Sequence, residues 1–126
     1  MKPGLKIGYE EKLVITVSSD MFARFDNSVV HPLYSTVSLV YHMEWVSRNI
    51  IHPYLEEDEE GMGVEVEVKH ISAANEGSMV EFHAKVTTYT EKAVITSIEV
   101  YSSEKLVATG TVKQAILPKK IIEKMY

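Results

Sequence analysis

The sequence predicts an α+β fold in which an antiparallel five-stranded sheet wraps around one long central helix. Residues 37–51 contain neither glycine nor proline and carry apolar side chains at helical spacing. The segments before and after them alternate apolar and polar residues, which is typical of half-buried strands. The expected order is one strand, the helix and four strands. A single curved sheet is the obvious surface to cover the apolar face of such a helix.

The composition fits one ordinary globular domain, which we expect to span residues 1–126. With 45% apolar and 25% charged residues, the chain can bury a hydrophobic core. Its formal net charge of −5 argues against binding to nucleic acid. No apolar run approaches the ~20 residues of a membrane span, and the first residues do not look like a secretory leader. The chain has no cysteine, which fits a reducing compartment, so we expect a cytoplasmic protein without membrane association.

The first strand is expected within residues 5–17, where apolar and polar residues alternate. Residues 21–32 have no clear period, and we interpret them as a short helical turn followed by a loop. The acidic run at 56–60 follows the helix and is interpreted as a solvated loop.

Four further strands are expected after the acidic run. The first begins at Gly63, and Val64, Val66 and Val68 of this strand are expected to share one face. The other three are expected at 79–89, 93–102 and 106–117, separated by short connections that suit antiparallel hairpins. One helix enclosed by these five strands is the hotdog architecture.

The central helix has recognisable start and stop signals. Ser35 or Thr36 can cap its amino end, and Pro53 ends it because the residue before a proline avoids the helical region. Its apolar stripe is expected to consist of Val37, Val40, Tyr41, Ser47 and Ile51, with Glu44 in the middle.

Glu44 is therefore a carboxylate on a face that should be apolar. An unpaired buried carboxylate is costly and tends to take up a proton or find a partner. Glu44 is either a glutamate at the edge of the stripe that reaches water, or a functional group with a shifted pKa that acts as a base or nucleophile.

His70 lies on the face of the valine strand that we expect to be buried. It is either a core histidine or a proton carrier that works near neutral pH. The other four histidines show no ligand spacing, and His42 and His52 are expected to face solvent. We therefore expect no metal site and no cofactor.

Thr36 is expected to be the N-cap of the helix, where free backbone N–H groups could receive an oxygen atom as it gains negative charge. Thr36 and Glu44 are eight residues apart, or ~12 Å along a helix. The two cannot meet within one chain. They could share a site if two helices pair antiparallel in a homodimer, which can assemble further into a tetramer.

These three residues, in this order, resemble the fluoroacetyl-CoA thioesterase family. In that family a threonine at the helix start is followed by a glutamate eight residues later and a histidine twenty-six beyond it, and this sequence has the same spacing. The flanking sequence Pro53-Tyr54-Leu55-Glu56-Glu57 and the strand into His70 are similar too. The resemblance runs from about residue 5 to 119.

The resemblance implies hydrolysis of an acyl-CoA thioester. Glu44 would be the nucleophile or general base, His70 its acid/base partner, and Thr36 an orienting hydroxyl. Gly63 would let the acyl group approach the backbone closely. A phenylalanine that gates the pocket in the fluoroacetate enzyme is replaced by Val29-Val30, and an arginine by Gln114. These replacements at substrate-contacting positions point away from fluoroacetyl selectivity rather than from thioester hydrolysis.

Two other functions remain open from the sequence. One is a catalytically silent hotdog module that binds a CoA ester or a small acid. Such a module has no need to keep Thr36, Glu44 and His70 together, so their joint presence favours the enzyme. The other is a hotdog hydratase, which is less favoured because no Asp-and-His pair lies on a suitable loop.

Overall fold

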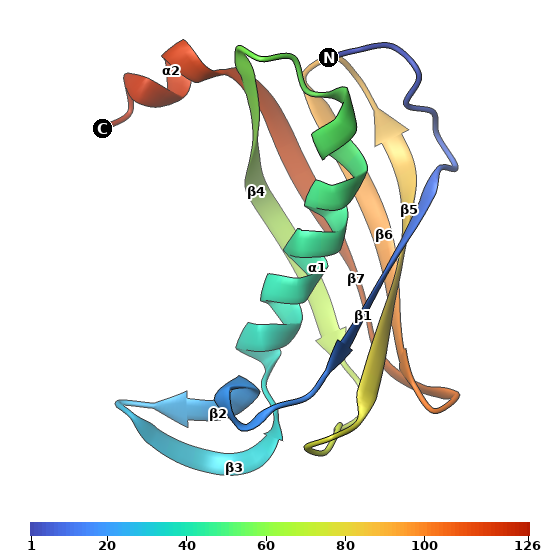
Figure 1. Ribbon diagram of the computed structural model, residues 1–126, viewed down its shortest axis with the longest axis vertical. Coiled ribbons are helices and arrows are strands. Elements are labelled where there is room, and N and C mark those ends of the chain that lie inside the picture. The colour runs from blue at the N-terminus through green and yellow to red at the C-terminus, as the bar shows by residue number, and fades with distance from the viewer.

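The computed structural model describes all 126 residues. Five strands form one antiparallel sheet in the spatial order β1-β5-β6-β7-β4. In chain order they are β1 (Glu10–Thr16), β4 (Glu59–His70), β5 (Met79–Tyr89), β6 (Ala93–Ser102) and β7 (Lys105–Pro118). The helix α1 (Thr36–Ile51) lies along the inner face of the curved sheet (Figure 1). The predicted α+β fold, with a five-stranded antiparallel sheet around one long helix, is confirmed.

The predicted strand bounds are close to the observed ones. β5 and β6 have the expected ends, and β7 is one residue longer at each end. β4 begins at Glu59, so the last two residues of the acidic run belong to a strand and not to a loop. Both are held by partners: Glu60 accepts two hydrogen bonds from Arg48 of α1, at 2.7 and 3.2 Å, and Glu59 pairs with the amino terminus.

The segment between β1 and α1 differs from the prediction. A single helical turn, η1 (Ser19–Met21), lies ahead of the predicted one and shares only Met21 with it. A hairpin of β2 (Phe22–Phe25) and β3 (Ser28–Tyr34) replaces the predicted turn and loop. Asp26 and Asn27 join the two strands, and both have positive φ (53° and 65°), as a tight two-residue hairpin turn requires. Figure 1 shows the hairpin projecting beyond the sheet at the amino end of α1.

The buried side of α1 is rotated from the stripe that the sequence predicts. Its contact with the sheet is made chiefly by the buried side chains Leu39, Met43, Val46 and Ile50. Of the predicted stripe, Ser47 and Ile51 are buried, but Val37, Tyr41 and Glu44 are exposed. The helix has two apolar sides, and sequence periodicity alone did not identify the one that meets the sheet. Ser47 also hydrogen-bonds Thr96 of β6 at 2.7 Å, which satisfies a polar pair inside the core.

The remaining elements follow α1 and β7. The single turn η2 (His52–Tyr54) contains Pro53 directly after α1, so the predicted stop at the proline is confirmed. A short helix α2 (Lys119–Glu123) follows β7 and extends away from the sheet at the end opposite the hairpin (Figure 1). None of the helices combines the length and apolar character needed to cross a membrane.

Gly110 of β7 lets the helix lie close to the sheet, and this predicts the effect of filling its site. A Cβ at Gly110 would overlap the backbone oxygen of Glu67 on β4 and the end of Met43 on α1. Since strand backbone cannot move away cheaply, Gly110→Ala should lower the free energy of unfolding by about 1–3 kcal/mol. Urea denaturation measures this, with Thr111→Ala on the opposite face of β7 as the control. Equal stability of Gly110→Ala and wild type would show that the helix does not depend on this close approach.

Candidate active site

The amino end of α1 is capped by Ser35. Its side-chain oxygen accepts a hydrogen bond from the Ser38 backbone N–H at 3.0 Å. Thr36 is therefore the first helical residue, and its predicted role as the N-cap is wrong. Because Ser35 provides the cap, the hydroxyl of Thr36 is free to interact with another group.

A β-bulge in β4 determines where His70 points. Gly63 pairs with Gln114 of β7 and Glu65 pairs with Lys113, so Val64 is an extra residue without a partner. The bulge changes which residues face the helix, from the odd-numbered Gly63 to the even-numbered positions that follow. Val64 at the bulge is exposed, whereas Val66, Val68 and His70 at the end of the strand are half-buried.

Thr36 and His70 meet through a side-chain hydrogen bond. The distance from Thr36 Oγ1 to His70 Nδ1 is 2.9 Å. Burial lowers the pKa of the His70 imidazole, so the ring is neutral at pH 7 and can take up a proton. Its other nitrogen, Nε2, is buried and has no hydrogen-bond partner within the chain. The two side chains form a hydroxyl–imidazole pair at the positive end of a helix, where developing negative charge is stabilised.

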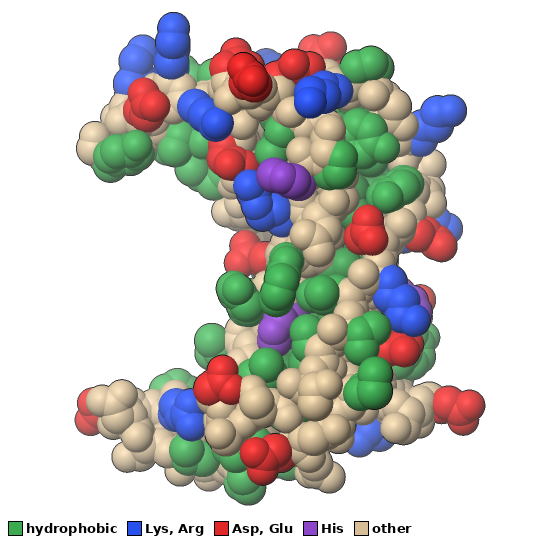
Figure 2. Space-filling model, viewed as in Figure 1, with side chains coloured by type: hydrophobic (Ala, Val, Ile, Leu, Met, Phe, Trp, Pro, Cys, Tyr) green, Lys and Arg blue, Asp and Glu red, His purple; other side chains and the backbone are tan.

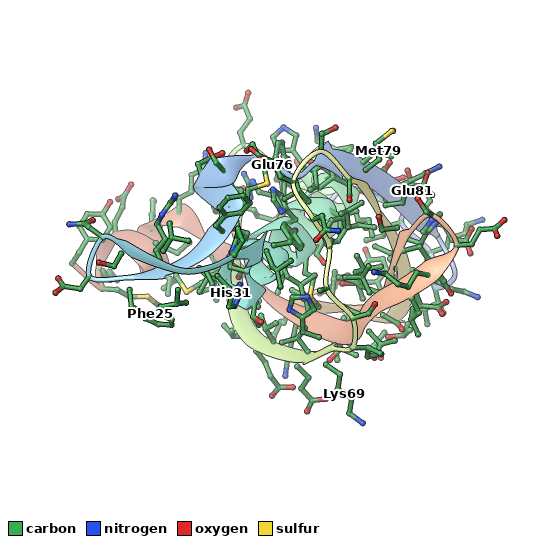
Figure 3. All side chains as sticks on the ribbon, turned by 90° about the horizontal axis from the view of Figure 1, so that it is seen from below. Phe25, His31, Lys69, Glu76, Met79 and Glu81 are labelled. Carbon is green, nitrogen blue, oxygen red and sulfur yellow. The ribbon has the colours of Figure 1, made fainter.

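A pocket of about 530 Å³ surrounds this pair. The hairpin forms its far wall, and Figure 3 shows Phe25 out on the hairpin and His31 nearer to the helix and sheet. Val30 lines the pocket beside Thr36 and His70, whereas Val29, the other predicted contact, is exposed and lies outside it. The other main apolar and aromatic lining residues are Phe22, Leu33, Tyr34, Val37 and Ile71.

Glu44 lies in a second cleft of about 400 Å³, away from the Thr36–His70 pair. It is exposed on α1, between Tyr41 and Trp45. Its carboxylate lies directly over Gly63, where any Cβ would overlap Glu44 Oε1. Glycine at position 63 therefore makes room for the carboxylate.

Gln114 of β7 also lines the second cleft. It is buried, and its amide Nε2 has no hydrogen-bond partner within the chain. The structure thus brings together two groups of the predicted residues. Thr36, His70 and Val30 line one pocket, and Glu44, Gly63 and Gln114 line the other. One chain does not unite all three predicted catalytic residues.

Two buried residues beside the first pocket were missed by the sequence analysis. The Tyr34 hydroxyl lies 2.6 Å from Nδ1 of His42, and both side chains are buried. The prediction that His42 faces solvent is wrong, because this position lies beside Met43 on the sheet side of α1. The sequence spacing already indicates that His42 is buried. His42 follows Leu39 by three residues and precedes Val46 by four, which places it on one helical face with them.

No three His, Asp or Glu side chains lie close enough together to hold a metal ion. The chemistry that the two pockets offer is instead that of a neutral imidazole, a hydroxyl and a carboxylate. These groups suit proton transfer and attack on a carbonyl carbon.

Solved structures with the same fold cover nearly the whole chain. A hypothetical protein from Thermus thermophilus, TTHA0967, described as a thioesterase superfamily member, is 36% identical with a TM-score of 0.91. The match covers 98% of this chain and 91% of that one. The fluoroacetyl-CoA thioesterase FlK is 21% identical with a TM-score of 0.89, over 97% and 96% of the two chains. A hot-dog-like protein from Thermanaerovibrio acidaminovorans is 22% identical with a TM-score of 0.87, over 98% and 90%.

Sequence comparison identifies the family more directly. No curated protein matches the chain. The family model described as fluoroacetyl-CoA-specific thioesterase, FlK, matches residues 17–120, which contain both pockets and all the predicted site residues. The chain therefore belongs to the FlK family of thioesterases and has the hotdog fold of that superfamily.

Proposed function

We propose that this chain is a cytoplasmic acyl-CoA thioesterase that hydrolyses a short-chain acyl-CoA to the free acid and CoA. The observation that carries the proposal is the hydrogen bond between Thr36 and His70 at the amino end of α1, beside a largely apolar pocket. Related proteins bind such ligands. A FlK variant was solved with acetyl-CoA, and a hypothetical thioesterase from Streptococcus pneumoniae was solved with coenzyme A.

The start of α1 suits a thioester carbonyl. The backbone N–H groups of Ser38 and Leu39 are bonded to Ser35. The N–H groups of Thr36 and Val37 precede them at the wall of the pocket, so they can donate to the carbonyl oxygen as it gains charge. The Thr36 hydroxyl orients the thioester or the attacking group, and neutral His70 transfers the proton.

Glu44 would complete the reaction in one of two ways. Its carboxylate could attack the thioester carbon and form an anhydride as CoA thiolate leaves, after which water hydrolyses the anhydride. Alternatively, it could take a proton from a water molecule that attacks the same carbon directly. In both routes one water is consumed, the departing sulfur gains a proton, and the free acid is released.

A homodimer would bring Glu44 to the Thr36–His70 pair. The exposed side of α1 is apolar around Glu44, with Val37 75%, Tyr41 60% and Trp45 44% exposed. It lies in the hollow between the hairpin and α2, where Figure 2 shows hydrophobic side chains gathered. Exposed apolar surface of this kind favours association. Antiparallel pairing of two helices about a two-fold axis would place Glu44 of each copy near His70 of the other, and a tetramer of such dimers would keep the same sites.

Except for Val29, the other predicted substrate contacts fit this arrangement. Gly63 and Gln114 lie beside Glu44, so the acyl group would pass close to the Gly63 backbone and the Gln114 amide. Val30 would contact the acyl group from the hairpin, whereas Val29 lies outside the pocket and is no longer proposed as a contact. A panel of short, branched and aromatic acyl-CoAs, assayed for release of free thiol, identifies the acyl group that this pocket accepts.

A catalytically silent module that binds a CoA ester is the alternative function. The unpartnered Nε2 of His70 would then serve only to bind the ligand. The two functions agree on binding and differ on turnover, so variants that preserve the shape of the site distinguish them.

Glu44→Gln should abolish hydrolysis while leaving binding of the CoA ester nearly intact, because a base or nucleophile acts mainly in the transition state. Its thermal midpoint should be no lower than that of wild type, since Glu44 is exposed.

His70→Ala should reduce turnover by roughly a hundred- to ten-thousandfold, as expected for a lost acid/base. Thiol release, calorimetric binding and thermal unfolding are measured together, with Glu57→Gln and His52→Ala as exposed controls. Turnover at the wild-type rate in Glu44→Gln would exclude Glu44 from the mechanism and favour the silent module.

The pH dependence of kcat/KM should report the neutral form of His70. Burial lowers the pKa of its imidazole below the ordinary value of about 6.5, so the ring loses its proton before pH 6.5 is reached from the acid side. We therefore expect the acid limb of the kcat/KM profile to have its midpoint below pH 6.5 and the profile to level off as the pH rises. An acid limb centred above pH 6.5 would contradict a neutral, desolvated imidazole as the proton carrier.

A further inference from the structure

Tyr34 and His42 form a buried polar pair that the proposed mechanism does not use. Tyr34 is the last residue of β3, and His42 lies in the middle of α1. The hydroxyl is 2.6 Å from Nδ1, and the two rings are stacked, with centroids 5.9 Å apart and an interplanar angle of 15°. Trp45 and Phe82 pack against the imidazole as well, with centroids 6.1 and 5.7 Å away. Leaving either buried polar group without its partner would be costly, so this hydrogen bond holds the Tyr34 side chain firmly against α1.

The Tyr34 ring also contacts the imidazole of His70. Their centroids are 6.4 Å apart and the rings meet at 76°, which is a favourable T-shaped arrangement. The Tyr34 backbone N–H donates to the carbonyl oxygen of Ala74 at 3.0 Å, in the segment that follows His70. Tyr34 is therefore fixed at its backbone by the chain beyond β4 and at its hydroxyl by α1, with His70 packed against the ring between them.

Side-chain hydrogen bonds hold only one of the two ring nitrogens of His70. Its Nδ1 has one partner, the Thr36 hydroxyl, and its buried Nε2 has none within the chain. In many sites where histidine acts, the second ring nitrogen is held by a hydrogen bond that fixes the tautomer. Here the Tyr34 ring packs against the imidazole, and such packing can restrain a ring as a hydrogen bond does.

We propose that Tyr34 and His42 are positioning residues, which hold the His70 imidazole in the orientation that directs Nδ1 to Thr36. His42 anchors the Tyr34 hydroxyl, and the Tyr34 ring restrains His70. The effect on turnover rests on the proposed thioesterase function, but the effect on the His70 ring does not.

Both members of the pair are uncharged at neutral pH, which keeps the anchor intact. Burial lowers the pKa of His42 and raises the pKa of Tyr34. The tyrosine hydroxyl therefore keeps its proton, and in the tautomer of His42 that carries its proton on Nε2 the hydroxyl donates to Nδ1.

The test removes the hydroxyl and its partner separately. Tyr34→Phe keeps the aromatic ring but loses the anchor, and His42→Leu removes the acceptor from the helix side. Tyr101→Phe is the control, because it removes a hydroxyl that bonds Glu99 at 2.9 Å on the outer face of the sheet, away from His70. Nitrogen NMR of the His70 ring then reports its tautomer and pKa, and steady-state kinetics report kcat and KM.

In wild type and Tyr101→Phe we expect one fixed tautomer of His70 and a pKa below about 6.5. In Tyr34→Phe and His42→Leu the two ring nitrogens should average toward tautomer exchange, and the pKa should rise toward the ordinary value. Turnover should fall by about ten- to hundredfold, the scale expected when a reacting group is misplaced. KM should change by no more than about twofold, because the substrate contacts remain. The double variant should be no worse than either single one, since both break the same link.

The proposal is overturned if the folded variants keep the wild-type tautomer and pKa of His70, even if they are less stable. If one variant fails to fold, the other still decides, because each breaks the link independently. A His70 ring that responds as expected in a protein without thioesterase activity would support the positioning pair and contradict the proposed function. The experiment therefore distinguishes failure of the positioning proposal from failure of the proposed thioesterase function.

Discussion

The packing of α1 into the curve of the sheet determines where Thr36, Glu44 and His70, the proposed catalytic residues, lie. Leu39, Met43, Val46 and Ile50 face the strands, and Gly110 leaves room for Met43 to approach the backbone of the neighbouring strand. This contact fixes the helix along its length. Its amino end then meets the end of β4, where Thr36 bonds His70, and its carboxyl end is tied to β4 through Arg48 and Glu60.

The unpaired polar atoms of the interior lie at the two halves of the proposed site. Buried polar groups in folded proteins almost always have a partner. Here two buried side-chain nitrogens have none within the chain, Nε2 of His70 and Nε2 of Gln114. One borders the pocket at the helix start and the other borders the cleft with Glu44. Elsewhere the core pairs its polar groups, as Ser47 does with Thr96, so the exceptions support a site that a ligand or a second copy completes.

The sequence was sufficient to predict the fold but not the orientation of the helix. Strands β5 and β6 could be bounded correctly because their alternation is regular and turn residues separate them. The helix could be bounded by its cap and by Pro53. The side of the helix that is buried could not be predicted from the sequence, because apolar residues occupy two sides of the helix and only one of these sides packs on the sheet. The hairpin was missed because residues 21–32 do not alternate, although Asp26 and Asn27 are typical of a tight turn.

The candidate site was predicted in part for similar reasons. Thr36 and His70 were selected by type and spacing, and the structure brings them together at 2.9 Å. The bulge at Val64, which directs His70 inward, leaves no trace in a simple alternating pattern. Tyr34 and His42 were missed because their hydrogen bond joins two elements whose contact depends on the rotation of the helix.

We propose that Glu44 of one copy works with Thr36 and His70 of another, and subunit complementation tests this shared site most directly. Glu44→Gln and His70→Ala chains, carrying different affinity tags, are co-expressed, and dimers that carry both tags are purified. Such a dimer would contain one site with both defects and one with neither, so about half of the wild-type turnover should return. A dimer with both tags and Glu44→Gln in each copy should stay inactive. If the mixed dimer is as inactive as either parent, or if no dimer forms and the monomer is active, the shared site is contradicted.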